Sequence, residues 1–157
     1  MVDTTSWWLA DWVWSIPIIL FTVALHAIGL LIVDVFVLEK LEGRLKKTRF
    51  RFRFPIIIST VVLFVTALHG LEASIWAAIY RLLDALPDDK TAMLYSLNAI
   101  TSFGHANVYL KPQWQLMGAF EALNGVMLFG LTTAFLFTVV SRVSMTRRGG
   151  VAAKSLK

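Results

Sequence analysis

The chain has 157 residues, of which 57% are hydrophobic and 16% are charged, and it carries a formal net charge of +5. This composition excludes an ordinary soluble domain and indicates a membrane protein, while the absence of cysteine excludes disulfides and thiolate metal sites. The basic residues lie in two blocks beside apolar runs, at residues 40–53 and 142–157, which is typical of membrane topology and not of nucleic-acid binding.

Three apolar runs, at residues 14–38, 54–80 and 115–140, are long enough to cross a membrane. A hydrocarbon core roughly 30 Å thick takes about 20 apolar residues in a helix. No basic residue precedes the first run, so we expect it to remain as a helix and not to be removed as a signal peptide. No internal repeat and no linker rich in glycine or proline divides the chain, and we expect one domain.

The basic blocks predict the orientation, because positively charged loops stay in the cytoplasm. We expect the N-terminus outside and the C-terminus in the cytoplasm, in the inner (plasma) membrane of a bacterium. Asp34, near the inner boundary, is expected to pair with a basic residue. Arg49, Arg51 and Arg53 alternate with phenylalanine, and they are predicted either to contact anionic lipid headgroups or simply to anchor the topology.

The segment between the second and third runs contains a shorter apolar run, at residues 91–100. Pro87, Asp88 and Asp89 before it are turn and N-cap residues, and the run is too short to cross a bilayer. A half-helix that enters the membrane and returns is the structure we expect. The polar, glycine-containing stretch after it needs protein or water around its backbone, and several copies around an axis would supply that cover.

This stretch resembles the selectivity filter of the potassium-channel family, which usually reads T-T-V-G-Y-G-D. The matching residues are Thr101, Ser102, Phe103, Gly104, His105, Ala106 and Asn107. The sequence G-V-M-L-F-G-L-T-T-A at residues 125–134 is similar to the inner helix of that family, and the resemblance covers roughly residues 61–141.

Together with the three apolar runs, the resemblance implies an all-α membrane protein with three transmembrane helices, a re-entrant pore helix and a filter loop, assembled as a homotetramer around a potassium-channel-like pore. Residues 1–53, which lie outside the resemblance, would hold an N-terminal aromatic segment, the first helix and a basic cytoplasmic loop. Residues 54–141 would form the pore domain, and residues 142–157 a basic cytoplasmic tail. The function implied is a cation channel that conducts a monovalent cation, K⁺ or Na⁺.

Three departures from the family pattern point to relaxed selectivity. His105 replaces the tyrosine that braces the filter, Ala106 replaces the second glycine, and Asn107 replaces an aspartate. Because histidine titrates at about pH 6.5, four His105 side chains at the pore mouth would repel cations in mild acid. The alternative is that His105 packs behind the loop.

Ionisable and amide side chains within the apolar runs are candidates for support of the filter, because such groups are costly in a membrane. The predicted support residues are His69, Glu72, Glu121 and Asn124. His69 and Glu72 are expected to bond to Tyr95, Asn98 or Asn107, with Glu121 and Asn124 acting from the last apolar run, and the alternative is a clamp between helices.

The last apolar run carries the candidate gate. Phe129, Thr133 and Phe137 recur every four residues, and the resemblance places this stripe on the pore side, with Phe137 at the cytoplasmic exit. Gly125 and Gly130 are candidate hinges.

Two other functions stay open. One is a non-conducting or accessory scaffold with the same architecture, and the other is a redox protein that holds haem between His26 and His69. We expect no enzymatic activity, because neither G-x-S-x-G nor H-E-x-x-H occurs, and we expect no metal and no cofactor besides the permeant ion.

Overall fold

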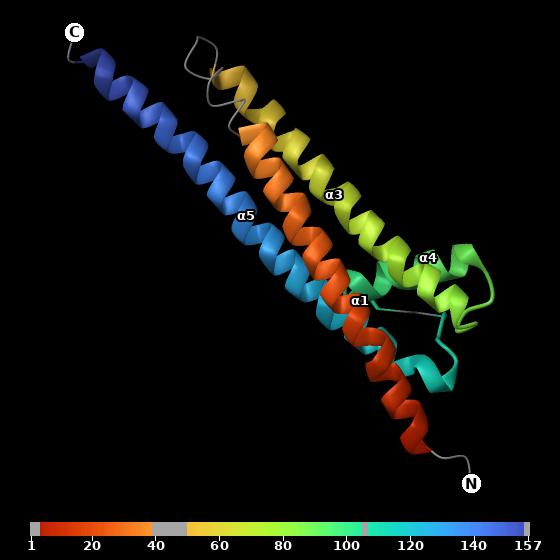
Figure 1. Ribbon diagram of the computed structural model, residues 1–157. Helices are drawn as coiled ribbons and strands as arrows, with labels where there is room; N and C mark the ends of the chain where they lie inside the picture. Colours follow the sequence, from red (N-terminus) through yellow and green to blue (C-terminus); the bar gives the residue numbers. More distant parts are fainter. Residues whose placement is uncertain (1–3, 39–49, 105–106, 156–157) are drawn as a thin grey trace. The chain divides into compact units, whose positions relative to one another are not determined.

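The computed structural model describes residues 4–38, 50–104 and 107–155. All regular elements within these ranges are helical (Figure 1). In chain order they are α1 (Thr4–Ile32), which continues as the π-helix η1 (Val33–Leu38), α3 (Phe50–Leu82), α4 (Asp89–Ile100), the 3₁₀ turn η2 (Pro112–Trp114) and α5 (Gln115–Ser155).

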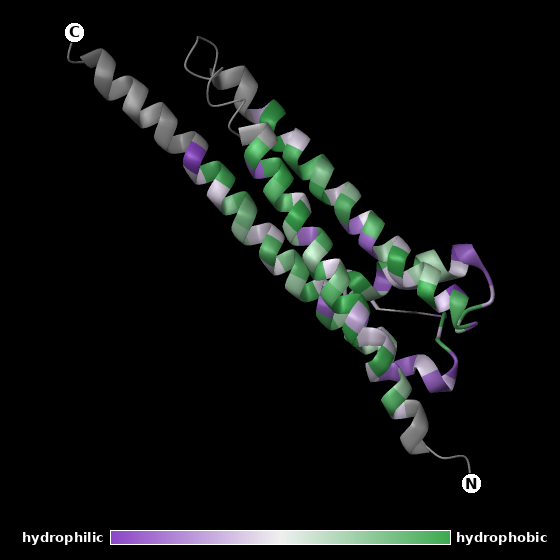
Figure 2. Cartoon of the chain, in the orientation of Figure 1, coloured by the Kyte–Doolittle hydropathy of each residue, from purple (hydrophilic) through white to green (hydrophobic). Residues whose placement is uncertain are grey.

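Three helices are long and apolar enough to cross a membrane, which confirms the prediction of an all-α membrane protein. The apolar stretches run over Trp8–Val35, Pro55–Leu82 and Pro112–Arg142. Figure 2 shows apolar residues along these helices and polar residues in the segments on either side of α4. The first stretch begins earlier than predicted, because the tryptophans near the N-terminus also lie in α1.

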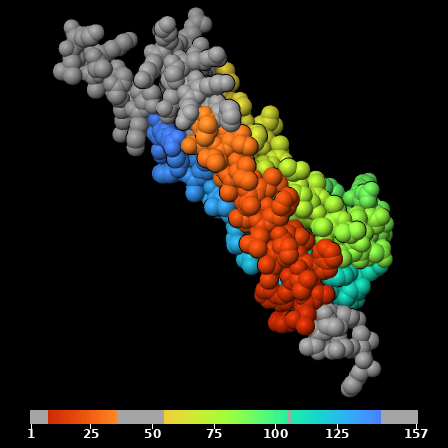
Figure 3. Space-filling view, in the orientation of Figure 1, coloured from red at the N-terminus to blue at the C-terminus, as the bar shows by residue number. Residues whose placement is uncertain are grey.

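The chain forms two compact units, described separately below. Unit 1 consists of Met1–His26 and Leu68–Phe129, and unit 2 consists of Ala27–Ala67 and Gly130–Lys157. The red part of α1 lies on the face of unit 1 that Figure 3 shows. Unit 1 holds α4 and the loop that follows it, and therefore the predicted filter.

The core of unit 1 forms around large aromatic side chains. Trp76 and Tyr80, one turn apart on α3, are fully buried, and the ring of Tyr95 from α4 meets Tyr80 edge to face at 5.4 Å between centroids. Met117 from α5 and Leu86 from the loop after α3 complete the same cluster. Burial of such rings stabilises the position of α4 against α3 and α5.

Helix α4 begins at an N-cap that the sequence predicts. Asp88 accepts hydrogen bonds from the backbone N–H of Thr91 at 2.9 Å and from its hydroxyl at 2.7 Å. These contacts satisfy a backbone donor that the first turn of a helix leaves without a partner. The predicted short helix is thereby confirmed, with 12 residues in place of the expected run 91–100.

Helices α3 and α4 both end in a left-handed residue that is not glycine. In α4, the N–H of Phe103 bonds to the carbonyl of Asn98, and the N–H of Ser102, whose φ is 53°, bonds to Ala99. In α3 the left-handed residue is Asp84, with φ 51°. This pairing of hydrogen bonds is the Schellman motif, in which glycine is the usual left-handed residue, so each site carries strain of roughly 1 kcal/mol.

Glycines allow α5 to lie directly against α4. A Cβ on Gly118 would overlap the hydroxyl of Tyr95, and a Cβ on Gly125 would overlap the carbonyl of Ile100. The two glycines are seven residues apart and therefore lie on the same face of α5. Close approach of backbones through small residues is the usual way in which membrane helices pack.

Unit 2 is held by a smaller apolar cluster and an ion pair. Val33 is buried with Ile57, Val61 and Val65 of α3. Asp34 accepts a hydrogen bond from Arg142 at 2.8 Å, which confirms that this carboxylate pairs with a basic residue.

Candidate functional site

The loop after α4 carries the described part of the predicted filter. Thr101, Ser102, Phe103 and Gly104 are all exposed, and Phe103 is 84% exposed. Gly104 has a φ of 90°, a conformation that favours glycine. Asn107 is exposed as well, while His105 and Ala106 lie outside the described residues.

The hydroxyl of Thr101 bonds back to α4. It donates to the carbonyl of Leu97 at 2.6 Å. The backbone N–H groups of Thr101, Ser102, Phe103 and Gly104 also bond to carbonyls in the last turn of α4. The start of the loop is therefore closely tied to the end of the helix in a single chain.

Glu121 of α5 connects three helices in unit 1. Its fully buried carboxylate accepts a hydrogen bond from the hydroxyl of Tyr80 on α3 at 2.7 Å and contacts the hydroxyl of Ser96 on α4. The Ser96 oxygen also lies 2.7 Å from the carbonyl of Ala73 on α3. These contacts hold α4 between α3 and α5 at the level of its second half.

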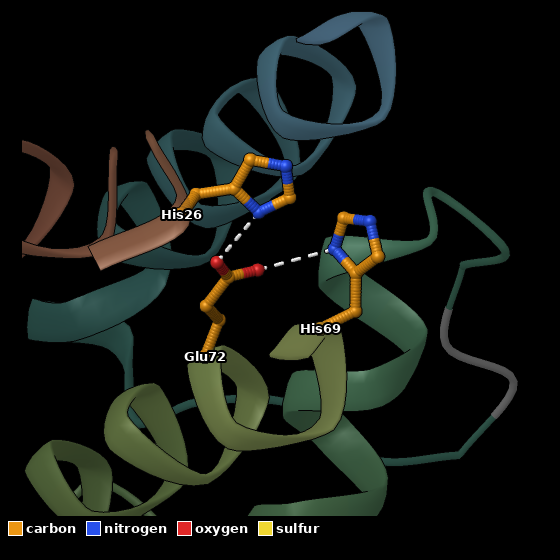
Figure 4. Close-up of side chains that lie close together, drawn as sticks. All are labelled: His26, His69 and Glu72. Carbon is orange, nitrogen blue, oxygen red and sulfur yellow. Dashed lines mark hydrogen bonds and ion pairs between the residues drawn. The ribbon is translucent and has the colours of Figure 1, made fainter. Parts of the chain in front are cut away.

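Glu72 of α3 lies between two histidines (Figure 4). Its Oε1 lies 2.8 Å from Nδ1 of His26 on α1, in hydrogen-bond geometry, and its Oε2 lies 3.1 Å from Nδ1 of His69. Glu72 and His26 are fully buried, and His69 is 12% exposed. The ring of His69 stacks on Phe129 of α5 at 4.3 Å between centroids.

A third contact joins α5 to α1. The side-chain amide of Asn124 donates to the hydroxyl of Thr22 at 2.8 Å, and that hydroxyl donates to the carbonyl of Ile18 at 2.9 Å. Both side chains are buried. The polar contacts of unit 1 thus connect α1, α3, α4 and α5.

Of the four predicted support residues, Glu121 contacts the loop-bearing helix α4, through the hydroxyl of Ser96. The expected partners of His69 and Glu72 are Tyr95, Asn98 or Asn107. The partners in the structure are His26, Thr22, Tyr80 and Ser96. Contacts of this kind agree with the alternative of a clamp between helices.

Sequence reasoning did not assign His26 and Thr22 to this support, although the first apolar run carries a signal for them. The buried polar residues of α1 lie four and seven positions apart, which places them on one helix face. They are Asp11, Ser15, Thr22 and His26. A polar stripe in an apolar helix indicates contact with other helices and not with lipid.

The remaining predicted residues have mixed surroundings. Thr133 is exposed and Phe137 is 74% exposed, as residues facing a pore or lipid would be. Gly130 has open space around it, whereas Gly125 lies against Ile100, so the hinge role of both stays a prediction. Arg49 and the side chains of Arg51 and Arg53 lie outside the described part of the chain, and their contact with lipid stays a prediction.

Comparison with known proteins provides no family assignment for this chain. The chain matches no family model, and comparison with curated proteins and with solved structures finds no match.

Proposed function

We propose that the chain is the pore-forming subunit of a homotetrameric cation channel with relaxed selectivity between K⁺ and Na⁺. The observation that carries the proposal is a short helix, packed inside its own chain, that ends in an exposed irregular loop between two membrane-spanning helices. The resemblance of residues 101–107 to a potassium-channel filter supports the same function.

The length of α4 supports entry into the membrane without crossing. At 1.5 Å per residue, its 12 residues extend roughly 18 Å, well short of a hydrocarbon core of about 30 Å. Its inner face packs on Trp76, Tyr80 and Met117, while Leu94 and Leu97 on its other side are exposed. The exposed side is therefore available to lipid or to a second copy.

The loop favours a second copy over lipid. Backbone outside regular structure is not tolerated in contact with hydrocarbon, because its polar groups then lack partners. Ser102 and Gly104 are exposed and irregular in the single chain. Four copies around an axis would enclose these groups with protein and water and turn carbonyl oxygens toward a shared path.

The chemistry of the loop favours cations of low charge. Residues 101–107 contain no acidic residue, so ions would meet hydroxyls, carbonyl and amide dipoles and the imidazole of His105, with no fixed negative charge. The C-terminal end of α4 adds roughly half a negative charge near the loop. Dipoles without fixed negative charge favour a monovalent cation. The departures at His105, Ala106 and Asn107 are the reason why strict selectivity is not expected.

The test is ion flux in liposomes, measured for K⁺, Na⁺ and Cl⁻ in turn. Flux of both cations without chloride is expected, and Gly104→Ala should reduce it because φ at this position disfavours a side chain. Gly70→Ala is the matched control, since Gly70 lies within α3 with open space around it. Absence of flux from protein that is tetrameric in detergent would refute the channel.

That last outcome would support a non-conducting scaffold, the second function compatible with this fold. The closure of α4 by the Schellman motif favours it, because hydrogen bonds from the loop occupy carbonyls at the helix end. We do not propose haem. The rings of His26 and His69 lie 5.0 Å apart with both Nδ1 atoms at Glu72, which leaves no place for a porphyrin between them.

A further inference from the structure

We propose that His26, His69 and Glu72 form a site for one divalent transition-metal ion, for which Zn²⁺ is the best fit. Ligand atoms of the three side chains all lie within 4.8 Å of one another. The three residues belong to unit 1 of a single chain. The site is therefore independent of the proposed tetramer and of conduction.

The donor set selects the class of metal. Two imidazoles and one carboxylate are a frequent set of three protein ligands for zinc, with a water in the fourth position. Ca²⁺ and Mg²⁺ prefer oxygen ligands throughout, so two imidazoles disfavour them. Zinc also requires no redox partner, and the site needs none.

The two contacts between Glu72 and the histidines are slightly shorter than the distances between neighbouring ligands of a bound zinc ion. Tetrahedral ligands at about 2.0–2.1 Å from zinc lie roughly 3.3 Å from each other. The two nitrogen–oxygen separations at Glu72 are 2.8 and 3.1 Å. These two contacts need to lengthen by only a few tenths of an ångström to match that separation.

The contacts of Glu72 also favour a metal site. Its Oε2 is buried, and Nδ1 of His69 contacts it as an ion-pair partner at 3.1 Å, outside regular hydrogen-bond geometry. A metal bond to this oxygen would replace that weak contact and be favourable. Binding requires that each imidazole carries its hydrogen on Nε2, and it replaces the hydrogen bond between Nδ1 of His26 and Glu72 by bonds to the metal.

The surroundings are suited to a fixed, water-poor site. His26 and Glu72 are fully buried, and stacking on Phe129 restrains the ring of His69. Of the three side chains, only that of His69 is partly exposed, at 12%. A bound metal would link α1 to α3 within unit 1 and stabilise the folded chain.

The experiment uses full-length protein in the His105→Ala background, purified by a tag without histidine. The chain has three histidines, so this background leaves only the two of the cluster. Metal-free protein is titrated with Co²⁺, and the visible absorption and the bound metal are measured. We expect about one Co²⁺ per chain with the strong absorption of four-coordinate cobalt, displacement by Zn²⁺ but not by Mg²⁺, and a higher melting temperature with Zn²⁺.

Substitutions distinguish Co²⁺ binding at the cluster from Co²⁺ binding at other carboxylates. Glu72→Gln and His26→Gln should weaken Co²⁺ binding at least about tenfold and remove the thermal shift. Asp89→Asn is the control, because Asp89 is an exposed carboxylate outside the cluster, and it should bind as before. Absence of binding in the folded His105→Ala protein would refute the site, whether or not the further variants fold, and so would unchanged binding in folded Glu72→Gln.

Discussion

Glu121 has surroundings that suit a neutral side chain. Ser96 has a single hydroxyl hydrogen but lies close to two acceptors, the carbonyl of Ala73 and the carboxylate of Glu121. When that hydrogen points to Ala73, the contact with Glu121 needs a hydrogen from the glutamate side. An amide at this position would supply it and would still accept from Tyr80.

We therefore predict that Glu121→Gln changes the free energy of unfolding by less than about 1 kcal/mol. Glu121→Ala should lose about 2–4 kcal/mol, because it leaves a cavity and removes the partner of two buried hydroxyls. Unfolding in mixed detergent micelles measures both. Equal losses for the two variants would contradict this account of the contact.

At the scale of elements, the packing of α5 on α4 depends on Gly125. We predict that Gly125→Ala destabilises the protein by about 1–3 kcal/mol, since a backbone carbonyl cannot move aside for the new methyl group. Gly130→Ala is the matched control in the same helix, where open space should allow a gain of up to about 1 kcal/mol from helix propensity. Thermal unfolding of both variants and of the parent protein measures these changes, and equal melting temperatures for the two variants would contradict the role of Gly125.

The N-terminus of α4 is predicted to depend on pH. Hydrogen bonds from the backbone N–H and hydroxyl of Thr91 lower the pKa of Asp88 below its ordinary value. A carboxyl whose pKa is lower in the folded state stabilises the fold above its unfolded pKa, and this contribution is lost as the pH falls through the folded value. The protection of amides at the start of α4, measured relative to their intrinsic exchange rate at each pH, should accordingly fall below about pH 4.

Asp88→Asn should flatten this dependence, because asparagine caps a helix without titrating. Asp84 requires its own control, since the ion pair with Lys111 lowers the pKa of its carboxyl too. Asp84→Asn should leave the pH dependence at the start of α4 in place. A dependence that persists in Asp88→Asn would assign the effect to another group.

At the scale of the whole molecule, the absence of cysteine makes a direct test of assembly possible. In the proposed tetramer the exposed residue Phe103 lies near the axis in each of four copies, so Phe103→Cys should form disulfide-linked dimers under mild oxidation. Leu63→Cys is the control, a residue of α3 that is 71% exposed but distant from the loop in sequence. Non-reducing gel electrophoresis measures the product, and equal cross-linking of both variants would argue against the axis.

The elements of this protein were largely predictable, because they follow from local composition. Apolar runs long enough for a bilayer predicted the three long helices, and Asp88 before a short apolar run predicted α4 and its cap. The π-helical turn η1 was not predicted, since no local pattern marks it. Positive φ at Ser102 was missed for a related reason, because serine rarely takes the place of glycine there.

The candidate site was predictable in its residue types but not in its pairings. An ionisable residue inside an apolar run is conspicuous whatever it contacts, and so His69, Glu72, Glu121 and Asn124 were recognised as a group. Their partners depend on how the helices turn toward one another. His26 and Glu72 are 46 positions apart, and Thr22 and Asn124 are 102 apart.

The amino-acid sequence by itself determined that this chain is an all-helical membrane protein with a short capped helix before a polar loop, because length, hydropathy and capping act within a few turns of the chain. Tertiary structure alone decided which buried polar groups meet. The rotation of each helix about its axis is set by packing, such as that of Gly118 and Gly125 against α4, and this rotation brings His26 to Glu72 and Glu121 to Tyr80.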